Sequence, residues 1–147
     1  MTSSPGSRDA RHSVSVAGVV TDGQGRALLI RRRDTRHWEP PGGVLELGES
    51  IQAGLCREVR EETGLTVQPV ALTGVYKNME RGIIALVFRC EVRGGRLAIN
   101  DEVCGFQWAT PEEVKDMADE AFAIRILDAL SGQPSPAVRQ HDGTKLL

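Results

Sequence analysis

Short apolar runs rich in β-branched residues alternate with polar turns along most of the chain. The run VSVAGVV, residues 14–20, suits a buried strand, and ALLIRRR, residues 27–33, follows it after the turn TDGQG. Two longer segments, residues 65–76 and 82–92, are rich in strand formers and are separated by the polar loop KNMER. With a shorter strand around residues 105–108, the pattern predicts two hairpins and a further strand.

Three segments carry helix signals. The first runs from residue 49 or 50 to residue 63, and Gly64 supplies the stop that is typical of a helix C-terminus. Thr110 is placed to cap a second helix that begins with PEE. A third helix is expected over residues 119–130, where it ends before a Ser-Gly pair.

The first helix carries three glutamates within little more than one turn, in REVREETG, residues 57–64. At about 100° per residue, Glu58 and Glu62 continue the apolar stripe of the helix, and Glu61 flanks it. Like charges at i,i+3 and i,i+4 repel each other, and partial burial raises their pKa values. Such a cluster therefore needs a compensating cation.

Two interpretations of this cluster are open. In one, the helix is a solvated acidic surface balanced by Arg57 and Arg60. In the other, its carboxylates hold a hard divalent cation whose charge is directed at a phosphate substrate. The preceding PPGG loop bears on the choice, because Gly42 and Gly43 let the backbone approach a ligand closely and offer a carbonyl as an additional ligand.

Composition narrows the class of protein. The 147 residues correspond to one ordinary domain, and 40% hydrophobic content is enough for a core. A net charge of -2 leaves no basic field for general nucleic-acid binding. Three widely spaced cysteines without a CxxC pair favour a reducing compartment. No signal-peptide core or transmembrane run is present in the sequence, so we expect a cytoplasmic protein without a membrane partner.

One spaced pattern, G-x5-E-x7-R-E-U-x-E-E-x-G-U with U aliphatic, accommodates the glycine loop and the acidic helix together. Its specified positions are filled by Gly43, Glu49, Arg57, Glu58, Val59, Glu61, Glu62, Gly64 and Leu65. On these residues the chain resembles the Nudix hydrolase family, and the order of strands and helices is similar over about residues 13–130. The resemblance implies an α/β fold, an α/β/α sandwich with a mixed β-sheet, and a loop–helix–loop that binds magnesium for attack on a diphosphate linkage.

The same resemblance implies roles for single residues. Glu58 would also orient or deprotonate the attacking water, and Arg57, paired with Glu49, would position carboxylates through charge-assisted hydrogen bonds. Manganese is expected to substitute for magnesium. The implied metal ligands are Glu58, Glu61, Glu62 and the carbonyl of Gly42 or Gly43.

Many active members of the family use a further glutamate shortly before a tryptophan. Glu102, in DEVCGFQW, has that placement relative to Trp108, while Asp101 beside it competes for the role and an ordinary acidic loop residue is the alternative. With this candidate, the predicted catalytic residues are Arg57, Glu58, Glu61 and Glu102.

Candidates for substrate contact lie outside the signature. Successive side chains on a strand alternate, so the arginines of ALLIRRR cannot all face one way, and those on the loop side are candidates to clamp phosphates. A tyrosine on the second hairpin suits a nucleobase pocket and the core equally. The three histidines show no ligand spacing and are expected at the surface. The predicted substrate-binding residues are Arg31, Arg33, Tyr76 and Arg81.

We therefore predict magnesium-dependent hydrolysis of a nucleoside diphosphate linked to another group, with nucleoside triphosphates, including oxidised forms, as the leading substrates. An ADP-ribose or nucleotide-sugar pyrophosphatase is the alternative, although the proline typical of the ADP-ribose branch is missing, since Pro69 lies too close to the signature. A non-catalytic nucleotide-binding regulator is a second alternative, but such proteins usually have degenerate signatures. An isoprenoid diphosphate isomerase would need a cysteine placed for proton transfer, and only Cys104 lies near Glu102. A homodimer is common in the family.

The sequence divides into three parts. Residues 1–12 are expected to form a flexible N-terminal arm and residues 13–130 the Nudix domain. Residues 131–147, rich in Pro, Gly and Ser, are expected to form a loose C-terminal tail.

Overall fold

The computed structural model describes residues 10–147, so most of the predicted N-terminal arm lies outside the described residues. The helices are α2 (Ile51–Thr63), α3 (Pro111–Met117) and α4 (Glu120–Leu130). The predicted strands and helices are confirmed to within a few residues at their ends. The strands are β1 (Ser13–Thr21), β2 (Ala27–Arg32), β3 (Trp38–Glu39), β4 (Gly42–Val44), β5 (Leu65–Asn78), β6 (Ile83–Gly95), β7 (Val103–Ala109) and β8 (Ala137–His141).

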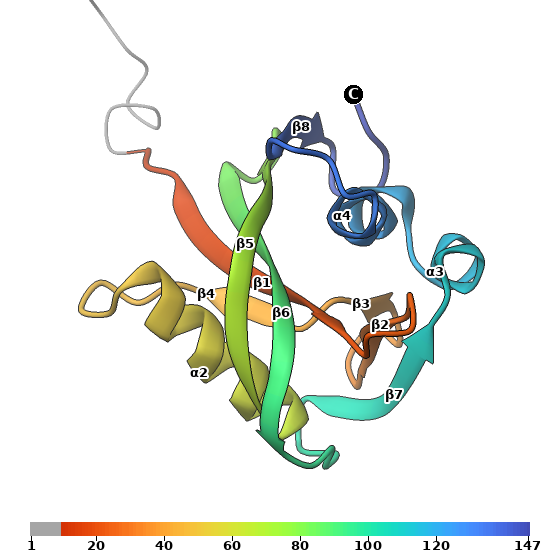
Figure 1. Cartoon of the computed structure of the whole chain (residues 1–147). Coiled ribbons are helices and arrows are strands. Elements are labelled where there is room, and N and C mark those ends of the chain that lie inside the picture. Colours follow the sequence, from red (N-terminus) through yellow and green to blue (C-terminus); the bar gives the residue numbers. More distant parts are fainter. Residues whose placement is uncertain (1–9) are drawn as a thin grey trace, which may run out of the picture.

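The strands form one mixed sheet in the order β3-β2-β1-β6-β5-β8, with β4 paired to β1 and β7 paired to β2. The predicted hairpins β1–β2 and β5–β6 are antiparallel. The pairs β1–β6 and β5–β8 are parallel, which makes the sheet mixed. In Figure 1, α2 lies on one side of this sheet, and α3 and α4 lie on the other. The predicted α/β/α sandwich is confirmed.

Strand β1 separates the two halves of the core. Val16 and Val20 face α2, where they pack with Leu55 and other buried residues. Val19 faces the opposite side, where it belongs to the same cluster as Ile126 of α4. This alternation is the period of two expected of a strand that is covered on both faces.

Helix α2, which carries the acidic cluster, has a defined start and a defined end. Ser50 is its N-cap and accepts a hydrogen bond from the Ala53 N–H at 3.2 Å. Gly64 ends the helix in the left-handed conformation, with φ of 85°, and donates to the Arg60 carbonyl. Both ends agree with the boundaries expected from the sequence.

The prediction of a loose tail over residues 131–147 was wrong for its later part. Residues Ala137–His141 form β8, which pairs in parallel with Gly74–Asn78 of β5. His141, expected at the surface, is 1% exposed, whereas His12 and His37 are exposed as predicted. Pairing with an open strand edge overrides the local composition, because the edge of β5 offers backbone partners that no local pattern reveals.

Candidate active site

Strand β4 and helix α2 approach each other closely through two glycines. The Gly42 N–H donates to Glu62 Oε1 at 2.6 Å. A Cβ at Gly43 would meet the Glu58 carboxylate, and a Cβ at Gly42 would meet the backbone of β1 at Val16 and Ala17. Glycine is therefore needed at both positions because of close packing, which brings two glutamates against the PPGG loop.

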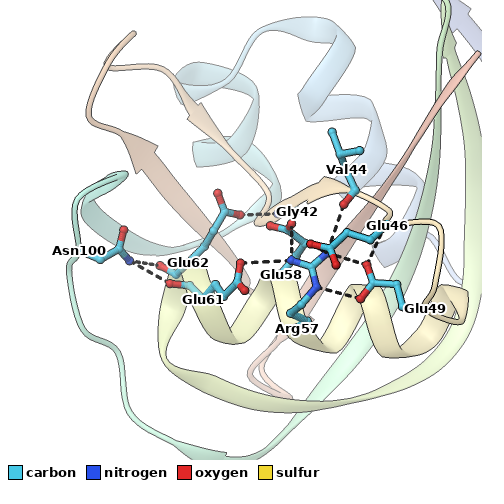
Figure 2. Close-up of polar contacts among 9 residues, drawn as sticks. All are labelled: Gly42, Val44, Glu46, Glu49, Arg57, Glu58, Glu61, Glu62 and Asn100. Atoms are coloured by element: carbon cyan, nitrogen blue, oxygen red, sulfur yellow. Dashed lines mark hydrogen bonds and ion pairs between the residues drawn. The ribbon is translucent and has the colours of Figure 1, made fainter.

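Arg57 links the carboxylates on the opposite side of the cluster (Figure 2). Its Nε and Nη2 donate to the two oxygens of Glu49 at 2.9 and 2.6 Å, which confirms the predicted ion pair. Its Nη1 donates to Glu58 at 2.9 Å and to Glu61 at 3.3 Å. The hydrogen bonds from Arg57 lower the pKa of Glu49 to about 2. Arg57 thus supplies one of the cations that the acidic cluster needs.

Two of the three clustered glutamates are withdrawn from solvent. Glu62 is 7% exposed, and burial, together with the charges of Glu58, Glu39 and Glu102, raises its pKa to about 8 despite the Gly42 N–H. Burial also raises the pKa of Glu58, with Arg57 opposing the shift and Glu61 and Glu102 adding to it. The apolar stripe therefore does continue into carboxylates, as the helix angles indicated.

Asn100 connects the end of α2 to the loop that carries Glu102. Its Nδ2 donates to the carbonyls of Glu61 at 3.2 Å and Glu62 at 3.0 Å. Its Oδ1 accepts from the Glu102 N–H at 2.9 Å and from the Val103 N–H at 3.0 Å. Figure 2 shows Asn100 reaching the last turn of the helix. The sequence analysis missed this residue, whose only local signal is that asparagine favours turns.

The charge of Glu102 acts on the acidic cluster. Its charge contributes to the raised pKa values of both Glu58 and Glu62, although it lies in the loop before β7. Asp101, the competing candidate, is exposed like Glu102, and its charge is not among the main causes of the raised pKa values of Glu58 or Glu62.

Glu58, Glu61 and Glu62 offer suitable ligand atoms for a hard divalent cation, but their carboxylates do not point toward one common position. All are oxygen donors, and burial, with a smaller contribution from neighbouring carboxylates, raises the pKa values of Glu58 and Glu62, which a bound cation would oppose. Within residues 10–147, no three acidic, histidine or cysteine side chains already form a ready-made metal site. The reason is that Glu58 and Glu61 turn toward Arg57, while Glu62 turns toward Gly42. Cation binding would require these side chains to exchange partners.

The predicted substrate-binding arginines are spread over different places. Arg31 donates to the Arg36 carbonyl at 3.2 Å and lies over the Trp38 ring. The Arg33 side chain donates to the carbonyl of Asn100 at 2.8 Å, so it holds the Glu102 loop in place. Arg81 is exposed and lines a cavity beside Gly42. Of the three arginines, Arg81 is the one that borders this cavity.

Tyr76 lies in the core, which decides between the two environments considered for it. The side chain is fully buried in the cluster on the α4 side of the sheet. Its hydroxyl donates to Asp128 at 2.7 Å, and burial raises its pKa. A position on the substrate-facing surface was therefore the wrong prediction, because the hydroxyl finds a buried carboxylate 52 residues away in sequence.

The cavity beside Gly42 and Gly43 has a volume of about 500 Å³. Arg32 and Glu39, an ion pair at 3.3 Å, form part of one wall. Helix α4 and the segment after β8 form the other wall. A second hollow lies on the outer side of α2, around Cys56 and Arg60, but only the first is lined by the two glycines.

The chain matches the model of the NUDIX domain over residues 11–130. It is 55% identical over 136 residues to a MutT-like protein of Streptomyces ambofaciens, covering 92% of this chain and 88% of that protein. It is 32% identical over 94 residues to a putative 8-oxo-dGTP diphosphatase of Bacillus subtilis (strain 168), covering 63% of each. The crystal structure of a UDP-X diphosphatase matches with a TM-score of 0.76 and 20% identity, over 91% of this chain and 70% of that chain, which supports the fold alone.

The chain therefore belongs to the Nudix family, as the signature indicated. It is a Nudix hydrolase that acts on pyrophosphate bonds of small nucleotide substrates, and members of the family typically use a divalent metal. Within residues 10–147, no helix combines the length and the apolar character needed to cross a membrane.

Proposed function

We propose that the protein is a magnesium-dependent pyrophosphohydrolase of nucleoside triphosphates, of the mutator or sanitising type. The observation that carries this proposal is the close approach of the Gly42–Gly43 strand to Glu58 and Glu62, with Glu102 brought to the same cluster. The similarity to a MutT-like protein and to a putative 8-oxo-dGTP diphosphatase supports the choice of substrate class.

The proposed metal ligands are the carboxylates of Glu58, Glu61 and Glu62 and one glycine carbonyl. The ladder between β1 and β4 favours Gly42 for the last role. Hydrogen bonds from Leu45 to Val14 and from Gly18 to Pro41 place the hydrogen-bonded positions of this antiparallel pair at every second residue. Gly43, opposite Val16, is one of these hydrogen-bonded positions, so its N–H and carbonyl point toward β1. The N–H and carbonyl of Gly42 point away from β1. The Gly42 N–H, which bonds to Glu62, points to the same side as its carbonyl.

A cation bound there would offset the negative charge that makes a diphosphate resist an incoming nucleophile. The protein's own residues orient the reaction. Arg57 holds Glu49 and is the positioning residue for Glu58 and Glu61. Glu58 and Glu102 are the two carboxylates proposed to orient and deprotonate the attacking water, and the raised pKa of Glu58 makes it a stronger base than a solvated glutamate. Arg81 on the cavity wall is proposed to contact the substrate phosphates.

The alternatives are a pyrophosphatase of ADP-ribose or nucleotide sugars and a non-catalytic nucleotide-binding regulator. The intact signature and the clustered glutamates weigh against the second alternative. A cytoplasmic location and a homodimer stay predictions.

The test measures the release of phosphate and pyrophosphate from a panel of nucleoside triphosphates, dinucleotides and nucleotide sugars, with and without magnesium or manganese. We expect metal-dependent turnover of triphosphates, and a loss of about a hundredfold or more in Glu61→Gln and Glu62→Gln. The matched control is Glu112→Gln, which changes an exposed glutamate of α3. Turnover that survives both site variants, or a preference for nucleotide sugars, would contradict the proposal.

A further inference from the structure

Arg125 on α4 is a buried arginine without a carboxylate partner. It is 8% exposed, and within residues 10–147 it forms no ion pair. Its Nε is buried without a hydrogen-bond partner. Its guanidinium lies over the rings of Phe122, at 4.8 Å, and Tyr76, at 5.4 Å. Burial lowers its pKa to about 10, so it still carries its charge at neutral pH.

Neighbouring acids compensate this charge only in part, since the charge of Glu39 raises the pKa of Arg125 without forming an ion pair with it. Asp128 is held by Arg139 through two hydrogen bonds of 2.8 Å and by the Tyr76 hydroxyl. Glu39 is paired with Arg32. Burying a charge without a partner destabilises a fold, so a purely structural role does not account for Arg125.

The polar contact that Arg125 makes with His141 brings together two hydrogen-bond donors. Arg125 Nη2 lies 3.4 Å from His141 Nε2. The Gly143 N–H donates to His141 Nδ1 at 2.9 Å, so Nδ1 is the acceptor of the ring. Burial and the charge of Arg125 lower the pKa of His141, so the ring is neutral and carries its proton on Nε2. Two donors therefore face each other without an acceptor between them.

Both donors border the cavity beside Gly42 and Gly43. The wall formed by His141 to Thr144 lies beyond residue 130, where the match to the family model ends. The cavity volume of about 500 Å³ exceeds what a single phosphate group needs, and Phe122, Ile83 and Ala85 give it an apolar part. Such a space suits a heterocycle that carries an oxygen acceptor.

We propose that Arg125 and the Nε2–H of His141 bind a carbonyl oxygen on the nucleobase of the substrate, and so select oxo bases over amino bases. This inference rests on the proposed function, because it assumes that the cavity holds the part of the nucleotide remote from the hydrolysed linkage. An exocyclic amino group would put a third donor against two donors, which is why the site discriminates.

The test compares two nucleotide pairs that differ by an oxo or an amino group on the base, ITP with ATP and UTP with CTP. In magnesium buffer, we expect the wild type to favour the oxo member of at least one pair by about tenfold or more in kcat/KM. Arg125→Met should abolish this preference, and His141→Phe should reduce it. Arg26→Met is the matched control, since it removes an arginine that pairs with Asp22 in the β1–β2 turn.

Three outcomes would overturn the inference. The first is the absence of an oxo preference in the wild type, and the second is a preference that survives Arg125→Met. The third is that Arg125→Met weakens inhibition by pyrophosphate as much as it weakens the use of the oxo nucleotide, which would assign the donors to phosphate. If Arg125→Met does not fold, His141→Phe decides. The same pairs are also titrated calorimetrically into Glu61→Gln protein. If the protein binds oxo nucleotides preferentially but the wild type hydrolyses no nucleotide, the proposed function is wrong and this inference still holds.

Discussion

Gly42 and Gly43 are neighbours in β4, yet a side chain at each would have different consequences. The space beside Gly43 is occupied by the carboxylate end of Glu58, which can move. The space beside Gly42 is occupied by the backbone of β1, which cannot move without disturbing the sheet. Gly43 therefore leaves room for the Glu58 side chain of the site, whereas Gly42 is needed for the packing of the sheet as well as for the site.

Alanine at each position should separate these two roles. We expect Gly43→Ala to displace Glu58 and to lower kcat by roughly a hundredfold, with little change in the thermal midpoint. Gly42→Ala should instead lower the free energy of unfolding by roughly 1–3 kcal/mol, because the added methyl group overpacks the sheet. Kinetics and thermal unfolding of both variants check the prediction, and a reversed pattern would show that the roles are assigned wrongly.

Glu62 makes the stability of the protein depend on pH. Its pKa rises from 4.5 to about 8 on folding, so the folded protein binds a proton that the unfolded chain releases. In buffer without divalent metal, we expect the contribution of Glu62 to the free energy of unfolding to be greatest below pH 4.5. This contribution should be lost as pH rises toward 8, by an amount on the order of a few kcal/mol. Magnesium should restore stability at pH 8.

Chemical denaturation between pH 5 and pH 8, with EDTA or magnesium, measures this dependence. Glu62→Gln removes the titrating group and keeps an oxygen for the Gly42 N–H, so its stability should change less with pH than that of the wild type. An identical pH dependence in both proteins would refute the assignment.

At the scale of elements, helix α2 is held in place at both ends and along one face. Ser50 caps its start, while the Asn100 side chain donates to carbonyls of its last turn and accepts from the N–H of Glu102. The hydrogen bonds from Asn100 tie two separate pieces of the acidic cluster together, so the geometry of the site depends on a residue that is not itself part of the signature.

Asn100→Ala should therefore lower kcat more than it raises KM. We expect a decrease of about tenfold to a hundredfold in kcat, and a decrease of about 1–2 kcal/mol in the free energy of unfolding. Asn100→Asp keeps the acceptor for the loop and loses the donor to the helix, and it should fall between alanine and the wild type. Ser50→Ala is the control, because it destabilises the same helix by about 1 kcal/mol without touching the Glu102 loop. Equal kinetic effects in Asn100→Ala and Ser50→Ala would contradict a positioning role.

At the scale of the whole molecule, the C-terminal segment completes the sheet and one wall of the cavity. Strand β8 is joined to α4 by Arg139, which is 35% exposed, and Asp128, whose side chain is 3% exposed. His141 then turns inward toward Arg125. The segment is thus part of the same folded unit as residues 13–130, and its removal would open the cavity.

Arg139→Ala should leave Asp128 buried with the Tyr76 hydroxyl as its remaining side-chain partner. We expect the free energy of unfolding to fall by roughly 3 kcal/mol, since breaking one half of a buried ion pair strands the other half. Gln140→Ala, at the exposed neighbouring position on β8, is the control and should change stability by less than about 0.5 kcal/mol. Equal unfolding midpoints for the two variants would restore the original expectation of a loose tail.

The sequence by itself determined the elements with strong local periods and the chemistry that falls on one helix. The strand runs, the caps Ser50 and Gly64, and the order of Arg57, Glu58, Glu61 and Glu62 on α2 could be predicted because they depend on residues within a few turns of one another. The pairing of Arg57 with Glu49 was implied by the resemblance to the Nudix signature.

Only the tertiary structure decided which distant groups meet. The contact of Tyr76 with Asp128 spans 52 residues, that of Arg125 with His141 spans 16, and Asn100 reaches α2 from 38 residues away. Side chains of this kind have no local signature, because their partners come from elements distant in sequence, such as α4 and β8 for Tyr76 and Arg125 and α2 for Asn100. For that reason a residue expected to face the substrate proved to be core, a segment expected to be loose proved to be a strand, and the unpaired donors of Arg125 became visible only in the folded chain.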